Sequence, residues 1–224
     1  NYGVTCFNYS SPVVENNEIT GGNANLCRGV YAYNGSWPTI RGCEITGCAS
    51  ATGASYSVLA VNNSSITVED CNLTNGIRAT GAPLLSHPTF TRCTVTATST
   101  VGNAFLLDGN ASVTIQDCVA TGQLCMSGSA AFSVATIDNL TMTQPRNQRA
   151  VFAAGGALIL ENSFISTADG INQEVIYAAT SIDATVRNCT IQGGGTSVPV
   201  IRQAAANAVL VLENNYICLL YTSP

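Results

Sequence analysis

The sequence predicts an all-β solenoid of about nine coils, each built from three short strands. Three observations lead to this prediction. A strand–bend–strand phrase recurs along the chain, its apolar residues fall into fixed columns, and residues suited to tight bends stand between the strands. The clearest copy is residues 65–76, where apolar and polar residues alternate on both sides of Asp70.

The phrase recurs nine times when it is aligned on Cys71, at intervals of 22 to 28 residues. Intervals of this size are typical of solenoids. The aligned positions are Asn17, Cys43, Cys71, Cys93, Cys118, Leu140, Ser163, Cys189 and Asn215.

Two columns beside the aligned position are apolar in every copy, and period-two alternation places them inside the solenoid. The column three residues earlier consists of Val14, Ile40, Val68, Phe90, Ile115, Ile137, Leu160, Val186 and Leu212. The column two residues later consists of Ile19, Ile45, Leu73, Val95, Ala120, Met142, Ile165, Ile191 and Ile217.

The residue just before the aligned position is Asn, Asp or Gly in every copy except one, where it is Arg92. Asn, Asp and Gly tolerate a left-handed backbone at little cost, so each copy is predicted to be strand, tight bend, strand. A third strand is expected upstream of most copies. Examples are residues 29–33, 57–61, 104–107, 150–152 and 174–177.

Such short strands bury their apolar columns only when the coils stack, with each strand about 4.8 Å from its neighbour. A β-sandwich is the rival architecture, but its strands recur at roughly 8–12 residues without fixed columns. We therefore expect a single domain, residues 1–217, cut from a longer chain. Residues 218–224 leave the pattern and are expected to be an unrelated tail.

Two runs carry a family resemblance. Gly-Gly-Ala-Leu-Ile-Leu-Glu-Asn-Ser-Phe-Ile at residues 155–165 resembles the repeats of polymorphic outer-membrane proteins and related surface proteins. Val-Arg-Asn-Cys-Thr-Ile at residues 186–191 is similar to the generic parallel β-helix repeat. The chain thus resembles the right-handed parallel β-helix, or pectate-lyase-like fold, over residues 13–217. This resemblance implies a secreted or cell-surface protein, but the fold hosts lyases, hydrolases, adhesins and phage tailspikes.

The composition excludes several partners. Charged residues make up 9% of the chain, the net charge is −5, and every basic residue is Arg. Such a chain offers no basic surface for nucleic acid or anionic lipid, and no apolar run is long enough for a membrane helix. Eight Asn-x-Ser/Thr triplets favour an extracellular or cell-surface location, although a chain rich in Asn, Ser and Thr also forms them by chance.

Ten cysteines allow two interpretations. Five lie in the aligned column, either as small buried thiols or as disulfides between adjacent coils. Outside that column are Cys6, Cys27, Cys48 and Cys125, with Cys218 in the tail, and Cys6 and Cys27 are the pair most suited to a bridge. The chain has no Cys-x-x-Cys and one histidine, His87, so we expect no zinc site and no cofactor.

Acidic residues on adjacent coils are candidates for a catalytic pair. Asp138 and Glu161 are at a spacing that suits a retaining glycosidase, but Arg187 and Glu213 continue their column and favour a solvated charge ladder. Glu18 and Glu44 form a second adjacent pair, with Arg41 nearby, and here too a surface role is favoured over catalysis. The Gly-His-Gly and Arg-Ile-Lys motifs of the hydrolases of this fold are absent.

The most regular outward feature is hydroxylic. The position three residues after the aligned one is occupied by Thr20, Thr46, Thr74, Thr96, Thr121, Thr143 and Ser166. The position four residues before it is Thr in six copies, namely Thr39, Thr67, Thr89, Thr114, Thr136 and Thr185. Thr is common in plain exposed strands. As a ligand surface, Thr46, Thr74, Thr96, Thr121 and Thr143 would suit a glycan or ice.

The expected function is that of a non-catalytic secreted or cell-surface protein, structural, adhesive or glycan-binding, with glycans or cell-surface polysaccharide as partners. Two alternatives stay open. One is a polysaccharide lyase or hydrolase whose catalytic coils are missing or degenerate. The other is an ice-binding protein that uses the Thr ranks.

Overall fold

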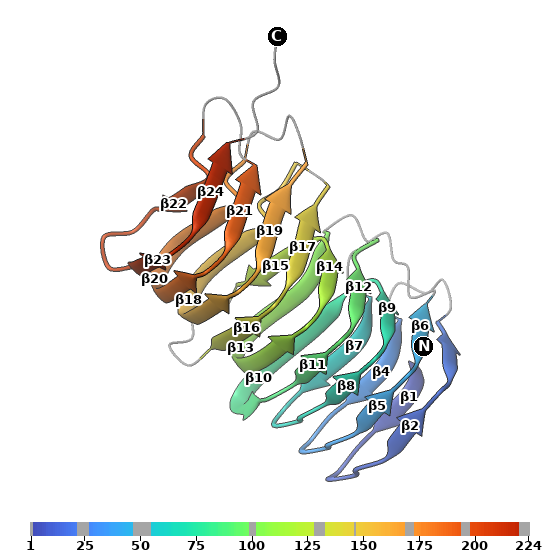
Figure 1. The fold of residues 1–224 in the computed structure, drawn as a ribbon. Helices are drawn as coiled ribbons and strands as arrows, with labels where there is room; N and C mark the ends of the chain where they lie inside the picture. The colour runs from blue at the N-terminus through green and yellow to red at the C-terminus, as the bar shows by residue number, and fades with distance from the viewer. Residues whose placement is uncertain are drawn as a thin grey trace.

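The computed structural model describes residues 2–21, 27–46, 55–98, 102–127, 133–145, 147–168, 173–193 and 198–219, with the backbone alone for residues 81–85. All helix or strand elements in these ranges are β-strands, and they stack in parallel along one axis from the N-terminal to the C-terminal end (Figure 1). The predicted all-β solenoid is confirmed. No helix of the described part is long and apolar enough to cross a membrane.

The strands that follow the bends form a parallel sheet of nine strands, which we call the post-bend sheet. Its strands pair in chain order, so equivalent positions of successive copies lie side by side. They are β3 (Glu18–Thr20), β6 (Glu44–Thr46), β9 (Asn72–Thr74), β12 (Thr94–Thr96), β14 (Val119–Thr121), β17 (Thr141–Gln144), β19 (Phe164–Thr167), β21 (Thr190–Gly193) and β24 (Tyr216–Leu219).

The strands that precede the bends and the predicted third strands belong to one 15-stranded sheet. Those before the bends are β2 (Val13–Glu15), β5 (Thr39–Arg41), β8 (Thr67–Glu69), β11 (Thr89–Thr91), β16 (Val134–Asp138) and β23 (Val209–Glu213). The upstream strands are β1 (Tyr2–Cys6), β4 (Arg28–Ala32), β7 (Tyr56–Val61), β10 (Ile77–Ser86), β15 (Gln123–Met126) and β22 (Ile201–Gln203).

Three strands join the two sets: β13 (Asn103–Gln116), β18 (Val151–Glu161) and β20 (Ile176–Arg187). Separate third strands were predicted here, and the structure instead shows continuous strands that turn the corner. Glycine explains two of the three corners, since Gly109 has φ 61°, Gly155 φ 112° and Gly156 φ 83°. These angles let the backbone bend while the ladder continues on both sides.

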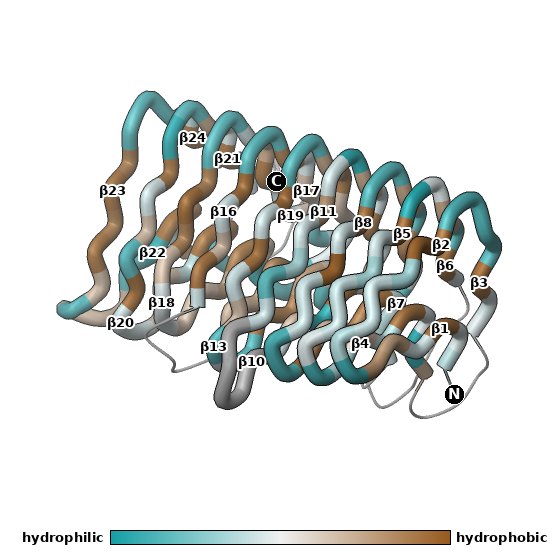
Figure 2. Tube along the Cα trace, turned by 90° about the horizontal axis from the view of Figure 1, so that it is seen from below, coloured by the Kyte–Doolittle hydropathy of each residue, from teal (hydrophilic) through white to brown (hydrophobic). Residues whose placement is uncertain are grey.

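The residues of the bend column all adopt the left-handed conformation, with φ between 50° and 56°. This confirms the prediction made from Asn, Asp and Gly. Arg92 has φ 52° although Arg has no preference for this region, so the stack imposes the bend on it. The bends line up as a hydrophilic edge of the solenoid (Figure 2).

The two predicted apolar columns form the core. Their side chains are buried except at the ends, where Val14 is partly buried, Leu212 is 44% exposed and Ile217 is 45% exposed. Leu212 and Ile217 lie on β23 and β24, each of which pairs with one neighbouring strand in the described part. Burial therefore depends on stacking against coils on both sides.

The nine cysteines in the described ranges are free, and the buried-thiol interpretation of the aligned column is confirmed. The predicted Cys6–Cys27 bridge is wrong. Cys6 pairs with Ala32, whereas Cys27 precedes Arg28, the partner of Tyr2. The two cysteines are thus five positions apart along the strands, roughly 16 Å, which exceeds the reach of a disulfide. Cys48 lies outside the described residues.

The predicted tail begins inside a strand. Cys218 and Leu219 are part of β24 and pair with Gln192 and Gly193. The remaining residues of the tail, 220–224, lie outside the described ranges.

Candidate functional site

The threonines predicted as ligand-binding lie in one straight rank on the outer face of the post-bend sheet. Thr74, Thr96, Thr121 and Thr143 are successive Cα partners. Thr46 directly follows Ile45, the partner of Leu73, and so continues the rank. We call Thr46, Thr74, Thr96, Thr121 and Thr143 the Thr rank. Thr143 is exposed, and the other four are half-buried by their neighbours.

The rank is not flanked by a second uniform row. The adjacent outward positions, two residues earlier on each strand, are Glu44, Asn72, Thr94, Val119 and Thr141. Thr94 and Thr141 repeat the hydroxyl, but the other three differ in charge and polarity. The face is therefore a single hydroxyl row beside a mixed one.

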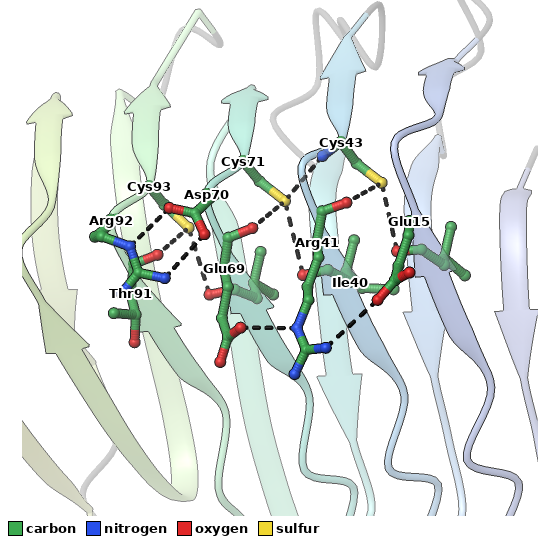
Figure 3. Close-up of polar contacts among 12 residues, drawn as sticks. Glu15, Ile40, Arg41, Cys43, Glu69, Asp70, Cys71, Thr91, Arg92 and Cys93 are labelled. Carbon is green, nitrogen blue, oxygen red and sulfur yellow. Dashed lines mark hydrogen bonds and ion pairs between the residues drawn. The ribbon is translucent and has the colours of Figure 1, made fainter.

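The acidic residues before the bends are engaged in a ladder of charges. Arg41 lies between Glu15 and Glu69, at 3.4 Å and 2.8 Å from their carboxylates (Figure 3). Glu161 pairs with Arg187. The candidate catalytic residue Asp138 is the Cα partner of Glu161 and accepts a hydrogen bond from the Asn162 amide at 2.7 Å.

A second row of polar contacts joins the bend residues. Asp70 and Arg92 form two hydrogen bonds, at 2.7 Å and 2.8 Å, and these lower the pKa of Asp70 (Figure 3). The amide of Asn139 donates to Asp117 at 2.7 Å. Glu18 and Glu44 lie side by side as predicted, while Arg41 pairs with Glu15 and Glu69 instead. The column before the bends thus forms the charge ladder that the sequence favours, whereas Glu18 and Glu44 have no ion pair in the part of the chain that the structure describes.

Sequence reasoning missed a cluster at the start of β20. Glu174 is almost fully buried, and its carboxylate binds Arg149 at 2.9 Å and Arg202 at 3.2 Å. The Arg149 guanidinium lies 4.0 Å from the centre of the Tyr177 ring, which stacks on Phe152. A signal existed in the sequence, because the spacings of 25 and 28 residues between these charges match the repeat.

A pocket of about 440 Å³ opens beside this cluster. Its lining consists of Gln123, Cys125, Asn147, Gln148, Arg149, Phe152 and Gln173. Among the described residues, no three His, Cys, Asp or Glu side chains gather closely enough to hold a metal ion. The chemistry of the pocket is therefore that of amides, one aromatic ring, one guanidinium and one thiol.

At the N-terminal end, aromatic side chains gather on and just beyond β1 and β4. Tyr31 stacks on Tyr2 at 5.4 Å and contacts Phe7 edge-on at 5.9 Å. The Arg28 guanidinium lies over both tyrosine rings, at 5.4 Å and 5.1 Å. Burial raises the pKa of Tyr31, more than Arg28 lowers it. These contacts tie the side chains of the first two coils together.

Comparison with known proteins agrees with this geometry. The family described as "Right handed beta helix region" matches residues 1–123 and 75–218, which together span nearly the whole chain. No curated protein and no solved structure matches the sequence. The parallel stack, the fixed columns and this match lead to one conclusion: the chain belongs to the right-handed β-helix family.

Proposed function

We propose that the chain is a non-catalytic β-helix of the extracellular space or cell surface, a rigid structural or adhesive element that binds glycans along its Thr rank. The register of the rank carries this proposal. Thr74, Thr96, Thr121 and Thr143 are paired strand to strand, so their hydroxyls repeat about every 4.8 Å. Each hydroxyl both donates and accepts hydrogen bonds, as the hydroxyls of an extended glycan do.

The contacts of the candidate acidic side chains support glycan binding without cleavage of the glycan. Glycoside cleavage needs a carboxyl group placed to transfer a proton and a second one to stabilise or attack the sugar. Of the candidate pair, Glu161 is bound to Arg187 and Asp138 to the amide of Asn162. Glu174 is buried between two arginines. A polysaccharide lyase or hydrolase that used Asp138, Glu161 or Glu174 would require these contacts to be given up.

Ice binding is the second candidate, because Thr94 and Thr141 place a second hydroxyl beside Thr96 and Thr143. An ice-like water layer needs an unbroken lattice, however, and Glu44 and Val119 interrupt it in the neighbouring row. A glycan contacts a row of hydroxyls without this requirement. Glycan binding is therefore the function that the surface supports best.

The test is co-sedimentation of the chain with cellulose, chitin, xylan, pectin and mannan. We expect binding to at least one polysaccharide, weakened about tenfold, or about 1.4 kcal/mol, by the double substitution Thr74→Tyr with Thr96→Tyr. The matched control is Thr67→Tyr with Thr89→Tyr, which are paired in the same way on the other sheet. The proposal is wrong if no polysaccharide binds, if both double variants bind alike, or if bound polysaccharide is cleaved. Thermal hysteresis that the first double variant abolishes would favour ice instead.

A further inference from the structure

The pocket beside Glu174 results from a gap in a row of side chains. The outward positions of five successive strands are Leu106, Cys125, Phe152, Tyr177 and Arg202, each the Cα partner of the next. Such positions lie about 4.8 Å apart, so large side chains stack along the row. Cys125 is the smallest of the five and leaves room between its neighbours. The segment 147–149 and Gln173 close the space that remains.

Phe152 offers the face of its ring to this space. Its ring is nearly parallel to that of Tyr177, at 14° and a centroid distance of 5.9 Å. Because Tyr177 covers one face, the opposite face is turned toward Cys125. An aromatic face packs well against the C–H groups on the flat side of a sugar ring.

Amide groups surround this ring and call for a ligand with hydroxyls. Gln123, Asn147, Gln148 and Gln173 each carry one acceptor and two donors. The Oε1 atom of Gln148 is buried and has no hydrogen-bond partner among the described residues. A buried acceptor without a donor costs free energy, so the side chain of Gln148 is not held by hydrogen bonds of its own oxygen. The Gln123 amide is held in place because its Nε2 donates to the Arg149 carbonyl at 3.0 Å.

The charged group in the pocket lining, Arg149, is already ion-paired with Glu174, which also binds the exposed Arg202. Burial acts to raise the pKa of Glu174, but its own backbone N–H and the two arginines outweigh this and hold its pKa below the ordinary value. Glu174 is therefore a carboxylate at neutral pH, and it offsets Arg149, whose guanidinium is also packed on Tyr177. An anionic ligand would have to give up its ionic hydration and compete with Glu174 for Arg149, whereas an uncharged one loses no ionic hydration on entry.

The thiol in the pocket is unreactive at neutral pH. Burial, with a smaller contribution from Asp108, raises the pKa of Cys125 to about 11. The nucleophilic form of cysteine is the thiolate, so the pocket holds a weak donor and no nucleophile. Its chemistry is suited to recognition.

We propose that this pocket binds one uncharged sugar unit, with its flat apolar side on Phe152 and its hydroxyls toward the amides that line the pocket. Its volume of about 440 Å³ lies in the range of small-molecule sites. The site is on the 15-stranded sheet and is separate from the Thr rank. This proposal can therefore be tested independently of glycan binding at the Thr rank.

The experiment is calorimetric titration of the whole chain with the methyl glycosides of glucose, galactose, mannose and xylose, and with glucuronic acid as the charged comparison. At least one glycoside is expected to bind with a Kd of about 1 mM or tighter. Glucuronic acid is expected to bind no more tightly than the methyl glucoside. Failure of all four glycosides to bind, or a clear preference for the acid, overturns the proposal.

Three substitutions locate the binding. Gln148→Leu removes one lining amide at similar size and should weaken binding about tenfold. Cys125→Phe fills the gap and should abolish binding, whereas Cys125→Ala keeps the gap and should bind as the wild type does. The Thr74→Tyr, Thr96→Tyr variant should also bind as the wild type. Circular dichroism checks that each variant is folded. Unchanged binding by both Gln148→Leu and Cys125→Phe, or loss of binding in the Thr variant, overturns the assignment.

Discussion

The backbone N–H of Cys93 donates a hydrogen bond to the sulfur of Cys118 on the next coil, across 3.4 Å. Equivalent bonds run from Cys43 to Cys71, from Leu140 to the Ser163 hydroxyl and from Cys189 to the Asn215 amide oxygen. The aligned column therefore meets the need for an N–H acceptor at four of its positions, whereas the buried Leu140 supplies none. Sulfur meets this need, and so do a hydroxyl and an amide.

Replacing Cys118 separates hydrogen bonding from size. Cys118→Ala leaves the buried N–H of Cys93 without an acceptor and should lower the free energy of unfolding by about 2 kcal/mol. Cys118→Ser keeps an acceptor, as Ser163 does naturally, and should lower it by only about 1 kcal/mol. Urea denaturation measures both values. Equal losses for the two variants would show that the hydrogen bond contributes nothing.

The regular part of the fold could be predicted because each coil uses the same residue types to bury its apolar side chains and to form its bend. The apolar columns and the bend column repeat in sequence and therefore in space. The bend at Arg92 shows the limit of residue type, since neighbouring coils impose its backbone conformation. The continuity of β13, β18 and β20 could not be predicted from the sequence. The number of residues between the upstream half and the pre-bend half differs from strand to strand, and pairing across the corner depends on the neighbouring coils.

The candidate sites were predicted unequally. The Thr rank was visible because it obeys the repeat. The pocket depends on the irregular segments before Ala150 and Val175, and on the size difference between Cys125 and Phe152, which matters only once the two are adjacent. A glutamate in a strand is ordinarily expected to be exposed. Glu174 can be buried only because Arg149 and Arg202 approach it from neighbouring coils.

The bend column predicts a strong dependence on residue type at Asn188, which has φ 54°. Asn188→Ala should lower the free energy of unfolding by about 1–2 kcal/mol, because a Cβ without a polar group is disfavoured in the left-handed region. Asn188→Gly should change it by less than about 0.5 kcal/mol, since glycine adopts this region freely. Thermal or urea unfolding decides, and an alanine variant as stable as the glycine variant would contradict the prediction.

At Gly29, the 15-stranded sheet and the post-bend sheet lie so close together that we expect no room for a larger side chain. A Cβ at this position would lie 2.1 Å from the Cγ2 atom of Ile45 and 2.7 Å from the carbonyl oxygen of Ser57. Because one of these neighbours is backbone, Gly29→Ala should destabilise the fold by about 3 kcal/mol. The double variant Gly29→Ala with Ile45→Leu, in which the β-branch carrying Cγ2 is absent, relieves only the side-chain clash and should recover part of the loss. Native stability of the single variant would contradict this account.

The Glu174 cluster predicts a loss of stability at acid pH. The folded-state pKa of Glu174 lies below its ordinary value of 4.5, so on acidification the unfolded state takes up the proton first. The stabilisation is then complete above pH 4.5 and is lost as the pH falls through the lower folded-state pKa.

Glu174→Gln should lower the free energy of unfolding by about 3 kcal/mol at neutral pH, because it breaks a buried ion pair. Urea denaturation should show this difference shrinking toward zero as the wild type is acidified below that pKa. The exposed substitution Glu44→Gln is the control and should show no comparable change. A difference between wild type and Glu174→Gln that stays constant with pH would mean that Glu174 stabilises the fold by packing and not by charge.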